Sequence, residues 1–258
     1  MTVVITGASS GIGLELSKRY AKKATKIYLL ARREQELNIL AGSLRQNNHG
    51  LSVETMAVDV TDFSKLTEVS EYICRSGEKI DILIANAGIS SEHKSDIYVF
   101  SDFKKIIETN FLSIAAMCEI FAKKMKLQKS GKIVIVSSLA SLVAFPTTAA
   151  YSASKRALNS FADSMRLLLR DDGVSVINIQ PGFIKTPLTA KNDFKMPFLM
   201  ELEHAVDKIE NAIEKNRAEY AFPFVFATFA KILSKMPRYL RDKIINAANY
   251  EKHRSKRV

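Results

Sequence analysis

Residues 2–13 read TVVITGASSGIG, and this stretch decides the fold. Its first five residues are apolar or β-branched and predict a buried strand, and a helical pattern begins after the last glycine. Gly7 permits a tight turn, while Gly11 and Gly13 let backbone N–H groups and a helix N-terminus approach a pyrophosphate. Strand, glycine loop and helix therefore follow one another in the order that a dinucleotide site requires. The spacing is GxxxGxG rather than GxGxxG, so an ordinary turn between a strand and a helix is the alternative.

Similar apolar runs recur along the rest of the 258-residue chain. They lie at residues 2–6, 26–31, 52–60, 80–85, 132–137 and 174–180. The segments between them have helical spacing, as in Leu37, Leu40, Ala41 and Leu44. This alternation predicts a single α/β domain over 1–258, a Rossmann-type doubly wound parallel sheet of about seven strands with helices on both faces. Ligands of such sheets bind at the carboxyl ends of the strands.

The second strand ends in Ala31-Arg32-Arg33, about 20 residues after the glycines. Residues at this position contact the ribose of the cofactor. An acidic residue there would bind a 2′-hydroxyl, whereas an arginine accommodates a 2′-phosphate. Ala31 stands where the acid is expected, so Arg32, together with Arg33, is placed for charge-assisted bonds to phosphate. We therefore expect NADP(H) rather than NAD(H), with two solvated arginines as the alternative.

Further motifs follow the glycine loop in chain order. They are Asp59 with Val60, Asn86-Ala87-Gly88, Asn110, Ser138, Tyr151-x-x-x-Lys155 and Pro181-Gly182. Together with the glycine loop, this set resembles the motif series of the short-chain dehydrogenase/reductase family, over roughly residues 2–190. One small departure is Ala85, where the family often has a second asparagine.

The resemblance implies a role for each part of the cofactor cleft. Asp59 and Val60 would lie beside the adenine, and Asn86-Ala87-Gly88 would line the cleft. Ser9, Ser10 and Ile12 would bind with the glycines, and Pro181, Gly182, Ile184 and Thr186 would surround the nicotinamide end. For two of these residues a structural role is an equal alternative: Asn86 would tie strand ends together, and Asp59 would cap a helix that begins near Thr61-Asp62.

Tyr151 and Lys155 are four residues apart in a segment with helical spacing, so their side chains share one face. A phenol with a pKa near ~10 exchanges protons poorly at neutral pH, and a nearby ammonium is expected to lower that pKa. Tyr151 is therefore the expected general acid in carbonyl reduction and general base in alcohol oxidation. Lys155 is expected to tune Tyr151 and to hold the nicotinamide ribose, which Tyr151 also borders.

Two polar residues complete the expected catalytic set. Ser138 follows the fifth apolar run, and its hydroxyl would donate to the substrate oxygen. The family's serine stands 13 residues before its tyrosine, which selects Ser138 over Ser137. Asn110 resembles the family's helix asparagine, whose backbone holds a water that relays protons through the lysine; a polar residue at a helix kink is the alternative.

Residues 187–215 are expected to form a lid over the substrate. Its apolar members are Phe194, Met196, Phe198, Leu199 and Met200, and the opposite wall would be Leu139, Leu142, Val143 and Phe145. An apolar substrate is favoured, although a lid that packs its own apolar side chains inward would look the same.

Residues 223–258 are expected to form a basic helical extension. The formal net charge of the chain is +11, and from Lys231 onward nine Lys and Arg face only Asp242 and Glu251. The segment is too interrupted to span a bilayer, which needs about 20 apolar residues, but it could contact a membrane surface weakly. A helix pair packed on the sheet or on another subunit is the alternative that we favour. No motif for nucleic-acid binding accompanies the basic residues, so we expect no nucleic-acid partner.

Several functions are excluded at this stage. The histidines at 49, 93, 204 and 253 lack ligand spacing, so no catalytic metal is expected. Cys74 and Cys118 also lack partner spacing and are interpreted as reduced core thiols. The N-terminal residues lack the layout of a secretory signal, which predicts a cytoplasmic protein.

The combined prediction is an NADP(H)-dependent oxidoreductase that interconverts a carbonyl and a secondary alcohol. The alternatives are a catalytically silent nucleotide-binding scaffold and, among enzymes, a reductase of 3-ketoacyl thioesters or lipid-like ketones. The thioester reductase ranks lower because the glycine-rich close that such family members usually have is missing from the last residues. The resemblance also implies a homodimer or homotetramer formed through the helices that contain Asn110 and Tyr151.

Overall fold

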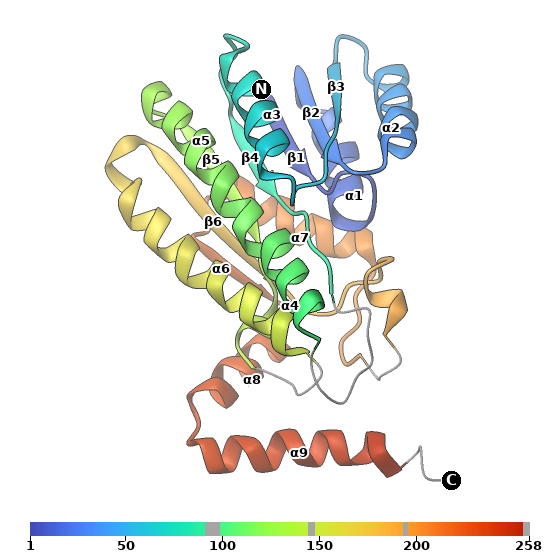
Figure 1. Ribbon diagram of the computed structural model, residues 1–258, viewed down its shortest axis with the longest axis vertical. Coiled ribbons are helices and arrows are strands. Elements are labelled where there is room, and N and C mark those ends of the chain that lie inside the picture. Colours follow the sequence, from blue (N-terminus) through green and yellow to red (C-terminus); the bar gives the residue numbers. More distant parts are fainter. Residues whose placement is uncertain (91–98, 144–147, 193–195, 255–258) are drawn as a thin grey trace.

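The computed structural model describes residues 1–90, 99–143, 148–192 and 196–254, with side chains described as far as residue 247. Its strands form one parallel sheet of seven in the order β3-β2-β1-β4-β5-β6-β7 (Figure 1). They are β1 (Thr2–Thr6), β2 (Lys26–Ala31), β3 (Ser52–Ala57), β4 (Ile82–Ala85), β5 (Gly131–Val136), β6 (Val174–Pro181) and β7 (Glu219–Phe222). The predicted doubly wound parallel sheet is therefore confirmed.

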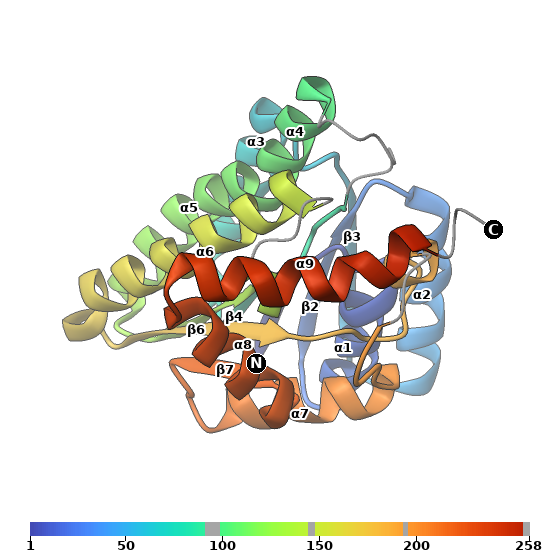
Figure 2. The same ribbon diagram turned by 90° about the horizontal axis from the view of Figure 1, so that it is seen from below.

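Helices cover both faces of this sheet (Figures 1 and 2). They are α1 (Gly11–Ala21), α2 (Glu34–Asn47), α3 (Phe63–Arg75), α4 (Phe100–Ile107), α5 (Ser113–Gln128), α6 (Ala149–Leu168), α7 (Leu202–Glu214), α8 (Phe224–Lys235) and α9 (Arg238–Arg254). Alternate residues of β1 supply the two cores: Val3 and Ile5 pack with α1, α2 and α7, whereas Val4 packs with α3, α5 and α6.

The topological switch point of the sheet, where the order of successive strands reverses, lies between β1 and β4. The chain runs from β1 outward through β2 to β3, and then crosses back so that β4 pairs with the other side of β1. Thr6 and Asn86 stand at the carboxyl ends of these two strands. Crevices at such switch points are where ligands of open α/β sheets bind.

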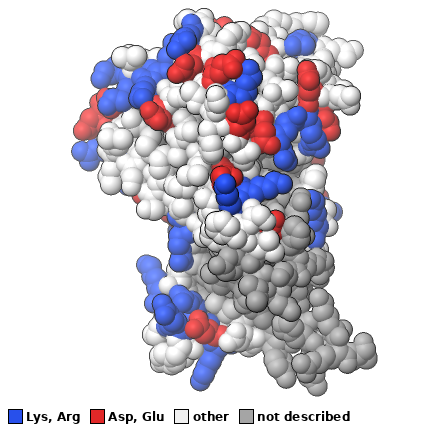
Figure 3. Space-filling model, in the orientation of Figure 1, with Lys and Arg blue, Asp and Glu red and all other residues white. Residues whose placement is uncertain are grey.

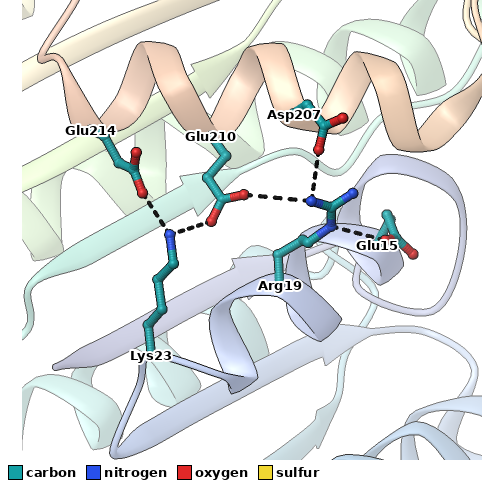
Figure 4. Close-up of polar contacts among 6 residues, drawn as sticks. All are labelled: Glu15, Arg19, Lys23, Asp207, Glu210 and Glu214. Carbon is teal, nitrogen blue, oxygen red and sulfur yellow. Dashed lines mark hydrogen bonds and ion pairs between the residues drawn. The ribbon is translucent and has the colours of Figure 1, made fainter.

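An ion-pair cluster fastens α7 to α1 (Figure 4). Arg19 lies 2.7 Å from Asp207, and Lys23 lies 2.6 Å from Glu210 and 2.5 Å from Glu214. These partners are 187 or more residues apart in sequence. Since most of these side chains are partly exposed, the ion pairs orient α7 against α1 but contribute little to the stability of the fold.

The last two helices lie at the end of the molecule toward which the strands point (Figure 1). Ala230 and Leu233 of α8 and Ile245 of α9 are buried in a small cluster with Val143. The extension predicted at 223–258 is thus helical over α8 and α9, and it rests on the segment that follows Ser138.

Candidate active site

The glycine loop after β1 has the backbone shape that its sequence requires. Gly7 and Gly11 adopt φ values of +66° and +54°, which side chains rarely tolerate. A Cβ on Gly13 would collide with the carbonyl oxygen of Gly7. The first turn of α1 therefore sits directly against the turn that leaves β1.

Asn86 closes the other side of this loop. Its Nδ2 donates to the Thr6 carbonyl at 3.0 Å, and its backbone N–H donates to the Thr6 hydroxyl at 3.0 Å. A Cβ on Gly7 would stand 2.9 Å from Asn86 Nδ2. The asparagine thus ties the ends of β1 and β4 together, as one of the two interpretations of its role predicted.

The donor groups at the loop suit an anion. Ser10 is the N-cap of α1 but makes no side-chain cap hydrogen bond, and the first turn of α1 contains no acidic residue. Arg33 Nη2 donates to the Ser9 hydroxyl at 2.9 Å and to its carbonyl at 3.2 Å. The guanidinium of Arg33 is thereby held over the loop, at the positive end of the α1 dipole.

Arg32 and Asp59 face each other beyond this loop. Arg32 Nη1 lies 3.8 Å from Asp59 Oδ2, and the Arg32 side chain is 57% exposed. Burial works to raise the pKa of Asp59, but hydrogen bonds from Thr61 and the charge of Arg32 outweigh it, so the pKa is lowered. The interpretation of Asp59 as a helix cap is wrong: Asp62 is the N-cap of α3, and Asp59 accepts hydrogen bonds from Thr61 instead.

The four expected catalytic residues come together at the carboxyl ends of β4 and β5. Tyr151 and Lys155 lie on one face of α6, with Lys155 Nζ 5.7 Å from the centre of the Tyr151 ring. Lys155 is 4% exposed, and its Nζ donates to the Val136 carbonyl at 2.8 Å. Ser138 follows β5 directly, and its Oγ accepts from the Ala140 N–H at 3.1 Å.

Asn110 lies in a π-helical turn, Glu108–Leu112, between α4 and α5. The side chain is fully buried, and it exchanges hydrogen bonds with the backbone of Ile89 at 2.8 and 2.9 Å. Its Nδ2 also donates to Ser154 Oγ at 3.1 Å. The helix kink, which was the alternative interpretation of Asn110, is therefore present. The Asn110 side chain links the segment after β4 to α6.

The electrostatics of the tyrosine differ from the expectation. Burial raises the pKa of Tyr151, and a hydrogen bond with Ser138 only opposes this rise. Burial also lowers the pKa of Lys155 to about 8. The direction is therefore opposite to the lowering that we expected from Lys155, because burial is the largest influence on the Tyr151 phenol.

A polar network behind the catalytic residues was missed by sequence reasoning. The Ser137 hydroxyl donates to Asn159 Oδ1 at 2.7 Å, and Asn159 Nδ2 donates to Ser141 Oγ at 2.7 Å. Asn178 on β6 also donates to Asn159 Oδ1, at 3.0 Å. Asn159 stands one turn after Lys155 on α6, and this helical spacing was the available signal. The network fixes the segment that carries Ser138.

Aromatic rings line the side of the site beyond Pro181. Phe183 stacks on Phe226 with ring centres 6.0 Å apart, and Phe198 stacks on Phe226 at 5.9 Å. A Cβ on Gly182 would stand 3.3 Å from the Phe226 ring. The rings come from the segment just after β6, the predicted lid and α8, so the extension contributes to this wall.

The remaining members of the predicted lid and wall are placed unevenly. Leu139 and Val143 are buried, Ile184 pairs with Met200, and Leu199 is 42% exposed. Leu142 is partly buried against Val143, and Met196 accepts a hydrogen bond from Asn192. Phe145 and Phe194 lie outside the described residues.

Other parts of the described chain show no further chemistry of the excluded kinds. No group of three or more His, Cys, Asp or Glu side chains among the described residues could hold a metal ion. Cys118 is buried and Cys74 partly buried, both as free thiols. None of the helices over the described residues is long and apolar enough to cross a membrane.

Comparison with known proteins agrees with this geometry. The family model described as short chain dehydrogenase matches residues 1–196. An uncharacterized oxidoreductase of Myxococcus xanthus is 35% identical over 241 residues, covering 93% of this chain and 94% of that protein. A fatty acyl-CoA reductase of Acinetobacter baylyi is 31% identical over 216 residues, covering 82% and 72%.

Solved structures share the fold. A short-chain dehydrogenase from Sphingobium yanoikuyae, in complex with NADPH, superposes with a TM-score of 0.80 at 24% identity, covering 92% of this chain and 96% of that one. An alcohol dehydrogenase from Comamonas testosteroni, specific for bulky-bulky ketones, gives a TM-score of 0.78 at 21% identity, covering 92% and 95%. With the family model matching most of its length, the chain belongs to the short-chain dehydrogenase/reductase family of oxidoreductases.

Proposed function

We propose that the chain is an NADP(H)-dependent enzyme that interconverts an apolar carbonyl compound and the corresponding secondary alcohol. The observation that carries the proposal is the convergence of Tyr151, Lys155 and Ser138 at the carboxyl ends of the strands, beside the glycine loop. A scaffold without catalysis would have no need for a buried lysine next to a half-buried tyrosine.

The residues at the loop fit a phosphorylated dinucleotide. The close approach of Gly13 to Gly7 leaves the N-terminus of α1 open, and Ser9, Ser10 and Ile12 supply backbone N–H groups there. Arg32 and Arg33 carry no acidic neighbour in the position that would bind a 2′-hydroxyl, so a 2′-phosphate is the group they suit. The Sphingobium yanoikuyae structure, in complex with NADPH, supports this choice.

The other cofactor contacts follow the sequence resemblance. Asp59 and Val60 would border the adenine, and Ala87 and Gly88 would line the cleft. Pro181, Gly182, Ile184 and Thr186 would enclose the nicotinamide end. A Cβ on Gly11 would stand 3.4 Å from Thr186, so the segment after β6 lies against the glycine loop.

The chain's own groups handle the proton. In the direction of reduction, the hydride that the carbonyl carbon receives would come from the cofactor when it is bound. The Tyr151 hydroxyl gives its proton to the carbonyl oxygen, and the Ser138 hydroxyl donates a hydrogen bond to that oxygen as its negative charge grows. Lys155 binds the ribose and stabilises the phenolate that remains, while Asn110 holds the relay that returns the proton.

An apolar substrate is proposed from the walls of the site. Phe183, Phe198 and Phe226 present stacked rings on one side, and Leu139 is buried on the other. The fatty acyl-CoA reductase relative makes a lipid-like carbonyl the second candidate for the substrate class.

A direct test compares nucleotide binding with turnover. Calorimetric titration should give tighter binding of NADPH than of NADH, and Arg32→Ala should remove the preference while keeping NADH affinity. Tyr151→Phe should bind NADPH like the wild type and reduce no carbonyl in a screen of aliphatic and aromatic ketones. If neither nucleotide binds, the enzyme proposal fails, and if NADPH binds but the wild type reduces no carbonyl, a nucleotide-binding scaffold takes its place.

We also propose a homodimer or homotetramer. Leu167 and Leu168 on α6 are 61% and 67% exposed, and Leu127 on α5 is 86% exposed. Light scattering during gel filtration gives the subunit number, and Leu167→Asp with Leu168→Asp should lower it. An unchanged mass would place the contact elsewhere.

A further inference from the structure

Helix α8 has two faces of opposite character along its length. Ala227, Ala230 and Leu233 are buried on the face toward the body. The opposite face exposes large apolar side chains to solvent: Phe224 at 81%, Val225 at 63%, Phe229 at 51% and Ile232 at 60%. At 100° per residue these four positions fall within one arc of the helix, so they form an apolar strip, in which Thr228 is also exposed.

The strip continues past the turn at Met236-Pro237. Tyr239 of α9 is 65% exposed, and Leu240 and Ile244 are 37% and 38% exposed. We call the apolar side chains of α8 and these three of α9 the terminal patch. Contiguous exposed apolar surface of this kind marks an interaction site.

Basic side chains gather at the end of the molecule that α8 and the start of α9 form (Figure 3). Lys231 lies at the edge of the α8 strip, Lys235 lies at the C-terminal end of α8, and Arg238 and Lys243 lie on α9; all four are exposed. Lys231 pairs with Glu219 at 2.5 Å, and Arg241 lies 3.7 Å from Asp242. From Lys231 onward the net charge is +7, from nine basic and two acidic residues.

We infer that the terminal patch docks the protein on the surface of an anionic phospholipid bilayer. The apolar strip would insert at the boundary of the acyl chains, and the lysine and arginine side chains beside it would contact the negatively charged head groups. A second copy of this chain would bring another segment of charge +7 against the first, which opposes self-association through the same face. Since neither helix of the extension can cross a bilayer, the contact is interfacial.

The inference does not rest on the proposed reaction, because the terminal patch lies on the outer face of α8. It concerns where the protein acts rather than what it does. In the absence of vesicles, turnover of a water-soluble ketone should therefore be the same in the wild type and in a variant that cannot dock.

The test uses the full-length protein and sedimentation with vesicles. Binding is expected to vesicles of phosphatidylcholine with phosphatidylserine, to be weak with phosphatidylcholine alone, and to fall as NaCl is raised. Phe224→Asp should lower the vesicle affinity about tenfold or more, because it places a charge in the apolar strip. Phe224 lies in the first turn of α8, where a carboxylate suits the helix dipole, so this variant should keep its fold.

The matched control is Ile39→Asp on α2, at an apolar residue that is 74% exposed and lies outside the extension. It should bind vesicles like the wild type. Circular dichroism and NADPH binding of both variants show that each has folded. Lys235→Glu should weaken binding to anionic vesicles and leave the weak binding to neutral vesicles unchanged.

Three results would overturn the inference. One is wild-type protein that binds anionic and neutral vesicles equally poorly. Another is an equal loss of binding in Phe224→Asp and Ile39→Asp. The third is an oligomer in gel filtration that only Phe224→Asp dissociates, which would assign the terminal patch to a second copy of the chain.

Discussion

Replacing Lys155 with methionine should make the folded protein more stable while it removes the proposed activity. Lys155 is 4% exposed, and burial lowers its pKa from 10.5 to about 8. A change of this size corresponds to about 3 kcal/mol of unfavourable free energy for the buried ammonium. Methionine keeps an apolar stem but leaves the Val136 carbonyl without the donor it has at 2.8 Å, a loss of about 1–2 kcal/mol. The net expectation at pH 7 is a gain of about 1 kcal/mol in the free energy of unfolding.

The stability difference between Lys155→Met and the wild type should also depend on pH. Between about pH 8 and 10.5 the folded state binds fewer protons at Lys155 than the unfolded state, so wild-type stability gains from this residue as pH rises. Lys155→Met lacks that gain, so its advantage should shrink by about 2 kcal/mol between about pH 7 and 9.5.

Urea unfolding followed by far-UV circular dichroism, at several pH values, measures the difference. Lys22→Met, at an exposed lysine after α1, is the control for loss of a lysine at the surface. A Lys155→Met protein that is less stable than wild type at pH 7, or a difference that does not change with pH, would refute the reasoning.

Three further predictions concern the frame of the site. Gly13→Ala should lower the free energy of unfolding by about 2 kcal/mol or more and abolish nucleotide binding, because the added Cβ would collide with a backbone carbonyl. Gly42→Ala is the control: its Cβ would have no atom within 4 Å, so it should raise the free energy of unfolding by up to about 1 kcal/mol in the same urea titration. Asn159→Ala should cost about 2 kcal/mol in thermal or urea unfolding, because it leaves several buried polar groups unpaired; an effect as small as that of a surface substitution would contradict its place in the network. Burial raises the pKa of the Cys118 thiol to about 12 and that of Cys74 to about 11, so an aromatic disulfide reagent near pH 8 should label neither quickly until urea is added. Fast labelling of the native protein would show that these thiols are less buried than described.

The sheet could be predicted closely because parallel strands buried on both faces leave continuous apolar runs. The run at 26–31 coincides with β2. The run at 52–60 was predicted too long: β3 ends at Ala57, and Val58 and Val60 are buried beyond its end in the core with α3. Strand β7 is only Glu219–Phe222, with a single buried residue, so it left no run to detect.

The candidate site was predictable in its members but not in its energetics. The motif spacing placed Ser138, Tyr151 and Lys155 together because each follows a strand end or shares a helix face. The pKa directions at Tyr151 and Lys155 depend on how deeply α6 is buried against β5, which is a property of packing. The role of Phe226 was hidden for the same reason, since only the path of the chain after β7 brings α8 beside Gly182.

The position of the C-terminal helices has a thermodynamic consequence. Val143, five residues after Ser138, is packed among Ala230, Leu233 and Ile245, and Phe226 of the same extension stacks on Phe183 next to Gly182. Any event that shifts α8 is therefore transmitted to both walls of the cleft. Thermodynamic linkage makes this effect mutual. If attachment at the outer face of α8 changes the affinity for a ligand in the cleft by some factor, binding of that ligand changes the affinity of attachment by the same factor.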